Sequence, residues 1–351
     1  MTTRTIVRAV VRGSLRDIHH VTAVPPNRAG GEVARVYARA EREFGVLAPP
    51  LALHSSAPEP LAACWLLLSR TLLTEGRVGR AVKEAVATEV SRANSCPYCV
   101  DIHQAAVDTL PRPTPDTPGA EAAAWLRSGA GQGEPAPFGA GETAEIIGVA
   151  LTFHYLNRMV NVFLDDSPVP APAALRGPIL RAVARTMRPA GGSLDTDADD
   201  DLLPGAPLPS ELRWAKAAPA VADALARSVA AVEHAARWVP HPVRALLTDR
   251  LADDGEGAPG PGRARLEAAL AGLREPDHRA IGRIALLTAF SAQQLTGADV
   301  AAFREHHPDD RELVELTSWA ALRTAVVVAG RLAAPPPRIR HPKPSSDPLS
   351  C

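Results

Sequence analysis

The chain has 351 residues, of which 46% are hydrophobic and 22% are charged, and its formal net charge is −1. This length and composition predict a globular protein with one large core or two modest ones. No long run of Lys or Arg interleaved with aromatics occurs, which argues against a nucleic-acid partner.

The N-terminal region has scattered arginines but neither an uninterrupted apolar core nor a small-residue cleavage site, so it is not typical of a signal peptide. The chain also contains no run of about eighteen apolar residues. We therefore expect a cytoplasmic protein that does not associate with a membrane.

Ala, Leu, Val, Arg and Glu predominate and alternating β-branched runs are few, which predicts an all-α fold. Pro- and Gly-rich breaks fall at residues 111–140, 189–209, 253–262 and 334–351. Helical patterns span residues 31–45, 58–75, 78–93, 97–109, 119–128, 142–164, 172–187, 210–237, 241–252, 263–273, 277–296, 299–306 and 310–332.

These breaks suggest four parts. We expect a first half of residues 1–190, a Pro/Gly/Asp-rich linker of residues 191–209, a helical second half of residues 210–333, and a disordered tail of residues 334–351. The Pro-rich segments have no role that the sequence reveals.

A weak internal repeat aligns residues 81–110 with the segment that starts at residue 280. The alignment sets Glu84 on Arg283, Cys96 on Leu295, Cys99 on Ala298 and His103 on Ala302. A degenerate duplication, in effect a pseudo-dimer within one chain, would explain this match, with the second half as a chemically silent partner that completes the core. Chance agreement between Ala/Leu-rich helices would also explain it, and both explanations stay open.

Four cysteines in a chain of this length do not make a disulfide-stapled fold. Cys64 lies in an apolar run and is expected to be a buried, inert thiol, while Cys351 ends the Pro/Ser-rich tail. Cys96 and Cys99 remain as the pair that could carry out redox chemistry.

The Cys96-Pro97-Tyr98-Cys99 segment is predicted to begin a helix, because Pro favours the first helical turn. Helix N-termini favour anions, so we expect a thiol there to be partly ionised at neutral pH. Offsets of three and four residues place His103 on the same helix face as both cysteines. If the preceding helix packs as a hairpin, Glu84 completes a proton relay.

Two other interpretations use the same residues. Cys-Pro-Tyr-Cys also occurs in glutaredoxins, but there it follows a β-strand, whereas the preceding segment here is helical. Cys96, Cys99 and His103 would supply three of the four ligands of a structural zinc, but no second Cys-x-x-Cys or His-x-x-x-His is present. The glutaredoxin fold is therefore rejected, zinc stays open as a less favoured alternative to redox chemistry, and we predict no metal.

The spacing of Glu84, Cys96-x-x-Cys99 and His103 resembles the alkyl hydroperoxidase D (AhpD) branch of the carboxymuconolactone decarboxylase family. The resemblance is strong over residues 75–110 and looser over residues 142–164. It implies an all-helical AhpD-like fold with peroxide-reducing or dithiol-exchanging activity.

Carried over by position, the resemblance makes Cys99 the peroxidatic thiol, Cys96 the resolving thiol, and Glu84 with His103 the proton relay. It implies a hydroperoxide or small electrophile as substrate and a thioredoxin- or lipoyl-type dithiol protein as reductant, with no metal or flavin cofactor. We also expect a homo-oligomer. Peroxidase members often carry His before the second cysteine, where this chain has Tyr98, a hydrogen-bond donor rather than a base at neutral pH.

The apolar segment 146–164 carries a polar stripe at His154, Asn157, Arg158 and Asn161, which fall within about 100° on a helical wheel. With Tyr98, these residues are candidate substrate-binding residues, and Arg158 is a candidate anion contact. An interior hydrogen-bond network or a subunit contact is the alternative interpretation.

The sequence therefore predicts a thiol-dependent peroxidase or disulfide oxidoreductase. The alternative is a non-enzymatic helical redox sensor or metal-binding interaction protein that uses the same cysteines and histidine.

Overall fold

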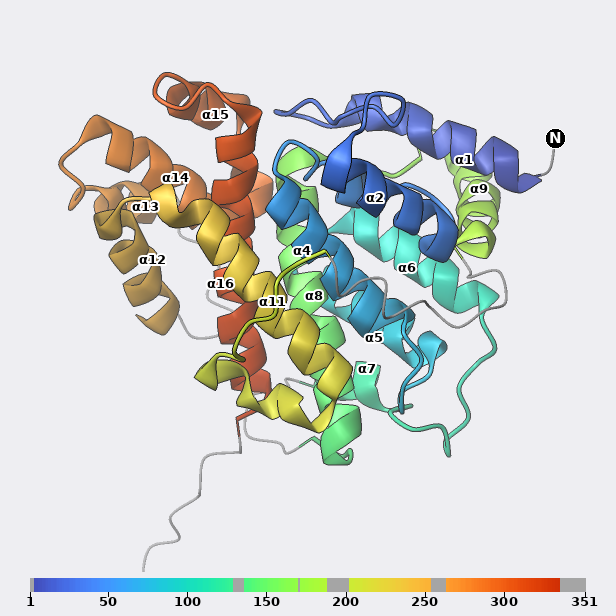
Figure 1. The fold of residues 1–351 in the computed structure, drawn as a ribbon. Helices are drawn as coiled ribbons and strands as arrows, with labels where there is room; N and C mark the ends of the chain where they lie inside the picture. The colour runs from blue at the N-terminus through green and yellow to red at the C-terminus, as the bar shows by residue number, and fades with distance from the viewer. Residues whose placement is uncertain (1–2, 129–135, 170, 188–201, 254–262, 335–351) are drawn as a thin grey trace, which may run out of the picture.

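The computed structural model describes residues 3–128, 136–169, 171–187, 202–253 and 263–334, and every regular element among them is helical (Figure 1). The all-α prediction is confirmed. The α-helices are α1 (Thr3–Gly13), α2 (Gly31–Arg39), α3 (Pro49–Ala52), α4 (Pro58–Leu68), α5 (Arg80–Ala93), α6 (Pro97–Thr109), α7 (Ala122–Arg127), α8 (Ala140–Phe163), α9 (Ala173–Thr186), α11 (Pro219–Ala235), α12 (His241–Asp253), α13 (Arg263–Leu270), α14 (Pro276–Phe290), α15 (Gly297–Arg304) and α16 (Asp310–Leu332).

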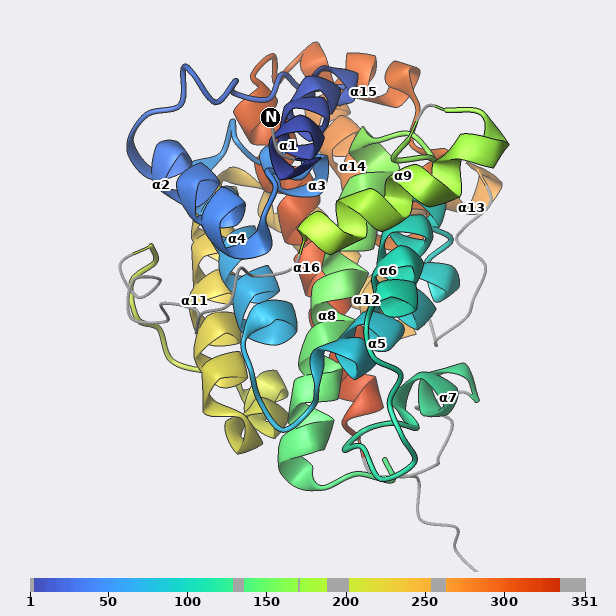
Figure 2. The ribbon, with the colours of Figure 1, turned by 90° about the vertical axis from the view of Figure 1, so that its right-hand side faces the viewer.

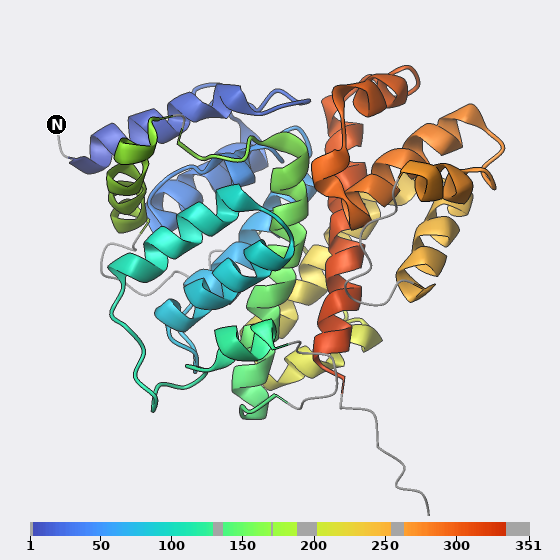
Figure 3. The same ribbon diagram turned by 180° about the vertical axis from the view of Figure 1, so that it is seen from behind.

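Two long helices, α8 and α16, run side by side through the middle of the molecule (Figure 3). Helix α4 packs against α11 in the same way, across the two halves of the chain. One cluster of buried apolar side chains, from Leu15 to Leu332, runs through both halves, so the second half completes the core of the first. Although α16 is long and apolar enough to cross a membrane, most of it is buried within this core.

The two halves also share an order of elements. Helix α5 packs on the long helix α8, and α14 packs on the long helix α16. This arrangement is the one expected of a duplicated unit, but the duplication itself stays a prediction. Residues 191–201 of the predicted linker and residues 335–351 of the predicted tail lie outside the described residues.

Some helix boundaries differ from the predicted ones. The predicted helix 58–75 is α4 followed by a π-helical turn, Ser69–Leu73, and the predicted helix 210–237 is a 3₁₀ segment, Ser210–Ala217, that gives way to α11 at Pro219. Helix α1 was not predicted, although its arginines recur at every fourth position and form the polar face of an amphipathic helix.

The turn between α5 and α6 reverses the chain sharply. Ser95 has a φ of 50°, a left-handed conformation that few non-glycine residues adopt. Pro97 then opens α6, where its missing N–H removes no helical hydrogen bond. The two helices consequently pack against each other as a hairpin.

A buried ion pair fixes the start of α5 against α8. The Glu145 carboxylate accepts the backbone N–H groups of Arg77 (2.9 Å) and Val78 (3.0 Å). Lys83 Nζ lies 3.7 Å from the same carboxylate and donates to the carbonyl of Thr74 at 2.9 Å. The loop before α5 is therefore tied to α8 at the end remote from the cysteines.

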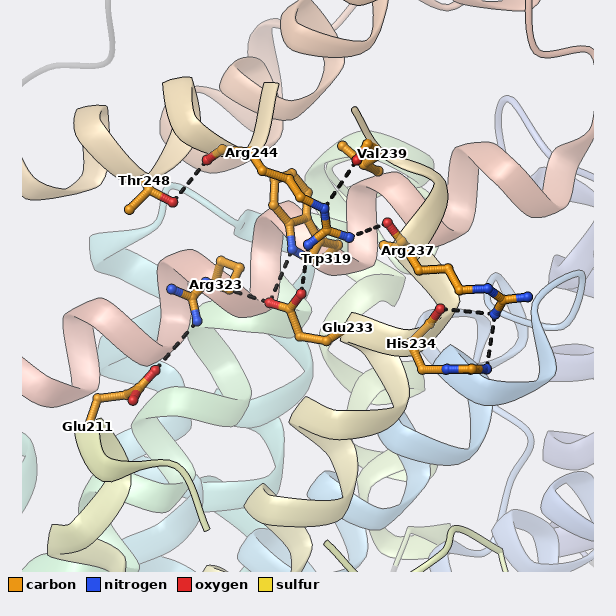
Figure 4. Close-up of polar contacts among 10 residues, drawn as sticks. Glu211, Glu233, His234, Arg237, Val239, Arg244, Thr248, Trp319 and Arg323 are labelled. Carbon is orange, nitrogen blue, oxygen red and sulfur yellow. Dashed lines mark hydrogen bonds and ion pairs between the residues drawn. The ribbon is translucent and has the colours of Figure 1, made fainter. Parts of the chain in front are cut away.

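A polar cluster joins α11, α12 and α16 in the second half (Figure 4). Glu233 accepts hydrogen bonds from Arg244 (2.8 Å) and Trp319 (3.2 Å), and Arg323 lies 3.7 Å away. The Arg244 guanidinium also stacks 4.8 Å from the centre of the Trp319 ring. These contacts link three helices through one carboxylate.

Replacing Glu233 with Ala should therefore lower the free energy of unfolding by about 1 to 2 kcal/mol, because Arg244, Trp319 and Arg323 lose the carboxylate that they share. Urea denaturation measures this. The matched control is Glu211→Ala, which removes one long contact of 3.5 Å to Arg323. Equal losses in the two variants would show that the Glu233 cluster does not join the helices as described.

Candidate functional site

Both cysteines of the Cys-x-x-Cys segment lie at the start of α6, as predicted. Cys96 immediately precedes the helix and Cys99 lies in its first turn. Both are free thiols, 1% and 4% exposed respectively. The sulfur atoms are therefore almost completely shielded from solvent.

The α5–α6 hairpin brings Glu84 and His103 together. The His103 Nδ1 atom lies 2.6 Å from Glu84 Oε2, and Arg80 donates from Nε to Glu84 Oε1 at 2.7 Å. The carboxyl group has no exposed surface. Burial alone would raise the pKa of Glu84, but the charges and hydrogen bonds of Arg80 and His103 outweigh it and lower that pKa to about 2.

An ionised Glu84 fixes the tautomer of the histidine. A carboxylate only accepts hydrogen bonds, so His103 must donate through Nδ1. In the neutral ring the lone pair then lies on Nε2, which is the atom that can accept a proton. The edge of the ring packs against Phe153 with centroids 4.5 Å apart, which further restricts its orientation.

The prediction of a partly ionised thiol is wrong for Cys99. Burial raises the pKa of the Cys99 thiol well above its usual value, and the adjacent Cys96 raises it further. The hydrogen bond from the Asn157 side chain acts in the opposite direction but does not compensate. Desolvation therefore outweighs the helix N-terminus, and Cys99 needs a base to become a thiolate.

The polar stripe of α8 forms a hydrogen-bond network around Asn94, the residue that ends α5. Asn94 Nδ2 donates to Asn157 Oδ1 at 3.0 Å, and its carbonyl accepts from Asn161 Nδ2 at 3.1 Å. His154 Nδ1 lies 3.0 Å from the Asn94 amide. The stripe thus supports the turn that carries the cysteines, as the network interpretation requires.

Arg158, the candidate anion contact, is bound to backbone instead. Its Nε donates to the carbonyl of Ala289 at 2.9 Å and its guanidinium donates to the carbonyl of His154 at 2.7 Å. Burial lowers the pKa of Arg158 to about 10, so it stays charged at neutral pH. Burial and this charge together lower the pKa of His154 to about 3, so that ring is neutral.

A cavity of about 90 Å³ lies against the thiol site, and α9, which contributes to its wall, packs against α6 and α1 (Figure 2). Tyr98, Cys99 and His103 all line it, and the rest of its wall is mostly apolar. The four stripe residues do not line this cavity. Their role in substrate binding stays a prediction, whereas Tyr98 lies where a ligand of the cavity would touch it.

Two residues of the site were missed. Arg80 stands four positions before Glu84, a spacing that signals a helical ion pair and could have been noticed. Asn94 directly follows the predicted helix 78–93, and nothing in the sequence signals that four stripe residues converge on it. Cys64 is buried as predicted, and burial raises the pKa of its thiol.

A structural zinc site would need at least three ligand side chains close together. Within the part of the chain that the structure describes, no group of three or more His, Cys, Asp or Glu side chains is arranged to hold a metal ion.

An all-helical fold with a thiol pair, a histidine and a carboxylate at one helical hairpin is the arrangement expected of an AhpD-like protein. No family model and no solved structure matches the chain. The chain is, however, 35% identical over 335 residues to alkyl hydroperoxide reductase Rv2159c of Mycobacterium tuberculosis, which covers 89% of this chain and 94% of that protein. The chain therefore belongs to the AhpD-like family of alkyl hydroperoxide reductases. The name of this relative supports a peroxidase-like function at the level of the family.

Replacing Glu84 with Gln should remove an acid-sensitive part of the stability. The pKa of Glu84 is about 2 in the fold, against a usual 4.5. The stabilisation is therefore complete above about pH 4.5 and disappears as the pH falls through about 2. We expect a loss of about 3 kcal/mol at neutral pH, because Arg80 and His103 lose their common partner.

Urea denaturation of both proteins at neutral pH and at several acidic pH values measures this effect, and the difference should shrink as the pH falls. The control is Glu121→Gln, at an exposed carboxylate before α7. A difference that does not change with pH would contradict an ionised Glu84.

Proposed function

We propose that this chain is a thiol-dependent peroxidase that reduces organic hydroperoxides through Cys99 and Cys96. The observation that carries the proposal is the position of His103. Its ring is held by the buried Glu84 carboxylate at 2.6 Å, and it lines the same cavity as Cys99. A base of fixed tautomer thus faces the cavity that holds a thiol in need of deprotonation.

In the first step, His103 Nε2 takes the proton of the Cys99 thiol. The thiolate attacks the outer oxygen of the hydroperoxide, the O–O bond breaks, and Cys99 becomes a sulfenic acid. The alkoxide that leaves takes the proton back from His103 and departs as an alcohol. Glu84 stabilises the imidazolium that exists between these proton transfers.

In the second step, the Cys96 thiol attacks the sulfenic sulfur of Cys99. A disulfide forms and water leaves. The packing of the two cysteine side chains in one buried cluster supports this pairing. A thioredoxin- or lipoyl-type dithiol then returns both sulfurs to thiols by two exchange steps and is itself oxidised to a disulfide.

Burial of the sulfurs places one requirement on this cycle. Because Cys96 and Cys99 are 1% and 4% exposed, a protein reductant reaches the disulfide only when the turn at residues 95–98 opens. The same burial favours the alternative function, a redox sensor whose thiols react slowly and form a regulatory disulfide. Turnover with a dithiol reductant separates the two functions.

Replacing Cys99 with Ser should lower the rate of hydroperoxide consumption at least about a hundredfold, because no other residue supplies the nucleophile. The assay follows loss of cumene hydroperoxide with excess dithiol. Cys96→Ser should still consume about one equivalent of peroxide, since only the resolving step is lost. Cys351→Ala, at the last residue of the sequence, is the matched control and should keep its turnover. A Cys99→Ser variant as fast as the original chain would exclude the proposal.

A further inference from the structure

Tyr98 stands between two cavities of opposite character. On one side is the apolar cavity of about 90 Å³ that contains Cys99 and His103, here called the inner cavity. On the other side is a cavity of about 430 Å³, here called the outer cavity. The two share Tyr98, Ser14, Pro49 and Pro168 as wall residues, so they adjoin each other at the thiol site.

The inner cavity is built to hold hydrocarbon. Its apolar wall is contributed by helices far apart in sequence, including Val11 of α1, Leu68 of α4, Leu156 of α8 and Val183 of α9. A ligand group placed there gains free energy by leaving water, roughly in proportion to the apolar area that it buries. No Asp, Glu, Lys or Arg side chain lines this cavity, so a carboxylate or other charged group would lose its hydration there without gaining an ionic partner.

The outer cavity offers polar partners instead. His19 Nε2 lies 2.9 Å from Asp165 Oδ1, and Arg16 Nε lies 4.0 Å from Asp17 Oδ1. All four side chains line the cavity and each is at least 46% exposed. Exposed pairs of this kind contribute little to stability, so they can exchange partners with the polar group of a ligand at little cost.

Tyr98 is the largest of the four side chains that line both cavities. Among the described residues, none is hydrogen-bonded to the Tyr98 hydroxyl, so rotation of the ring breaks no such bond. The ring packs against the buried cluster that contains both cysteines. A molecule that passes Tyr98 therefore passes Cys99.

We propose that the substrate is an amphiphilic hydroperoxide with its –OOH group partway along the chain. The apolar end occupies the inner cavity, the polar end group occupies the outer cavity, and the peroxide lies between them at Cys99. This inference rests on the proposed function and specifies its substrate class. Hydrogen peroxide would use neither cavity, and a compact alkyl hydroperoxide would use only the inner one.

The first experiment compares linoleic acid hydroperoxide with the hydroperoxide of an octadecadiene, which lacks the carboxylate, at equal detergent concentration. We expect kcat/KM to be about tenfold higher for the acid, the effect of one good polar contact. Cumene hydroperoxide and hydrogen peroxide give the baseline. Equal values for the acid and the hydrocarbon would overturn the proposal.

The second experiment removes the polar partners of the outer cavity. The double variant His19→Ala, Asp165→Ala should lower kcat/KM for linoleic acid hydroperoxide about tenfold and leave that for cumene hydroperoxide unchanged. The matched control is Arg283→Ala, Glu267→Ala, which removes an exposed ion pair of 2.6 Å in the second half. A double variant that affects both substrates equally, or neither, would contradict the assignment of the outer cavity.

Failure of the proposed function is distinguishable from failure of this inference. If no hydroperoxide is reduced, the proposed function fails, but the alcohol of linoleic acid hydroperoxide still tests the cavities by binding. Calorimetry should then show binding that weakens about tenfold in the His19→Ala, Asp165→Ala variant. Absence of binding to the original chain would overturn the inference on its own.

Discussion

A carboxylate without exposed surface stays ionised in this protein because Arg80 and His103 bind its two oxygens. Isolated burial of Glu84 would protonate it, and a protonated Glu84 could not hold the histidine in one tautomer. The 2.6 Å contact to His103 ties α5 to α6, fixes Nδ1 as the donor, and leaves Nε2 as the acceptor. The reactivity expected of Cys99 follows from this one interaction.

The thiol site combines a cysteine that does not ionise readily with a turn that is fixed by hydrogen bonds. Burial raises the pKa of Cys99, so the helix N-terminus alone does not supply a thiolate. Asn94 lies in the turn before α6, and hydrogen bonds from the polar stripe of α8 fix its position. Arg158 of that stripe reaches the carbonyl of Ala289 in the second half. The second half thus supports the site mechanically, through α16 and α14, without contributing a reactive side chain to it.

The parts of the site that could be predicted from the sequence are those formed by two helices that follow each other in the chain, α5 and α6. The offsets among Cys96, Cys99 and His103 follow from helical geometry, and Glu84 needed only the hairpin that Pro97 and the preceding turn produce. The all-α fold and most helices followed from composition and periodicity. Arg80 could have been predicted as well, because it stands one helical turn before Glu84.

The remainder depends on contacts between distant segments. Cys99 packs in one cluster with Val160 of α8, and residues as remote as Val11 and Val183 line the cavity beside it. No local pattern reports such contacts, so the ionisation of the thiol was predicted wrongly. The polar stripe showed that α8 had polar partners, but whether those were substrate or backbone depended on where Asn94 lies. The outer cavity likewise joins residues 14–19 to residues 164–168.

The most direct test is the pH dependence of the rate at which iodoacetamide alkylates Cys99, measured in a Cys96→Ser background with and without His103→Gln. If His103 accepts the proton of Cys99, the His103→Gln variant reacts at least about tenfold more slowly at neutral pH and its rate rises only at higher pH. Both proteins should react equally fast once unfolded in urea. Identical pH profiles in the folded proteins would contradict the account, because they would show that Glu84 and His103 do not act on the thiol.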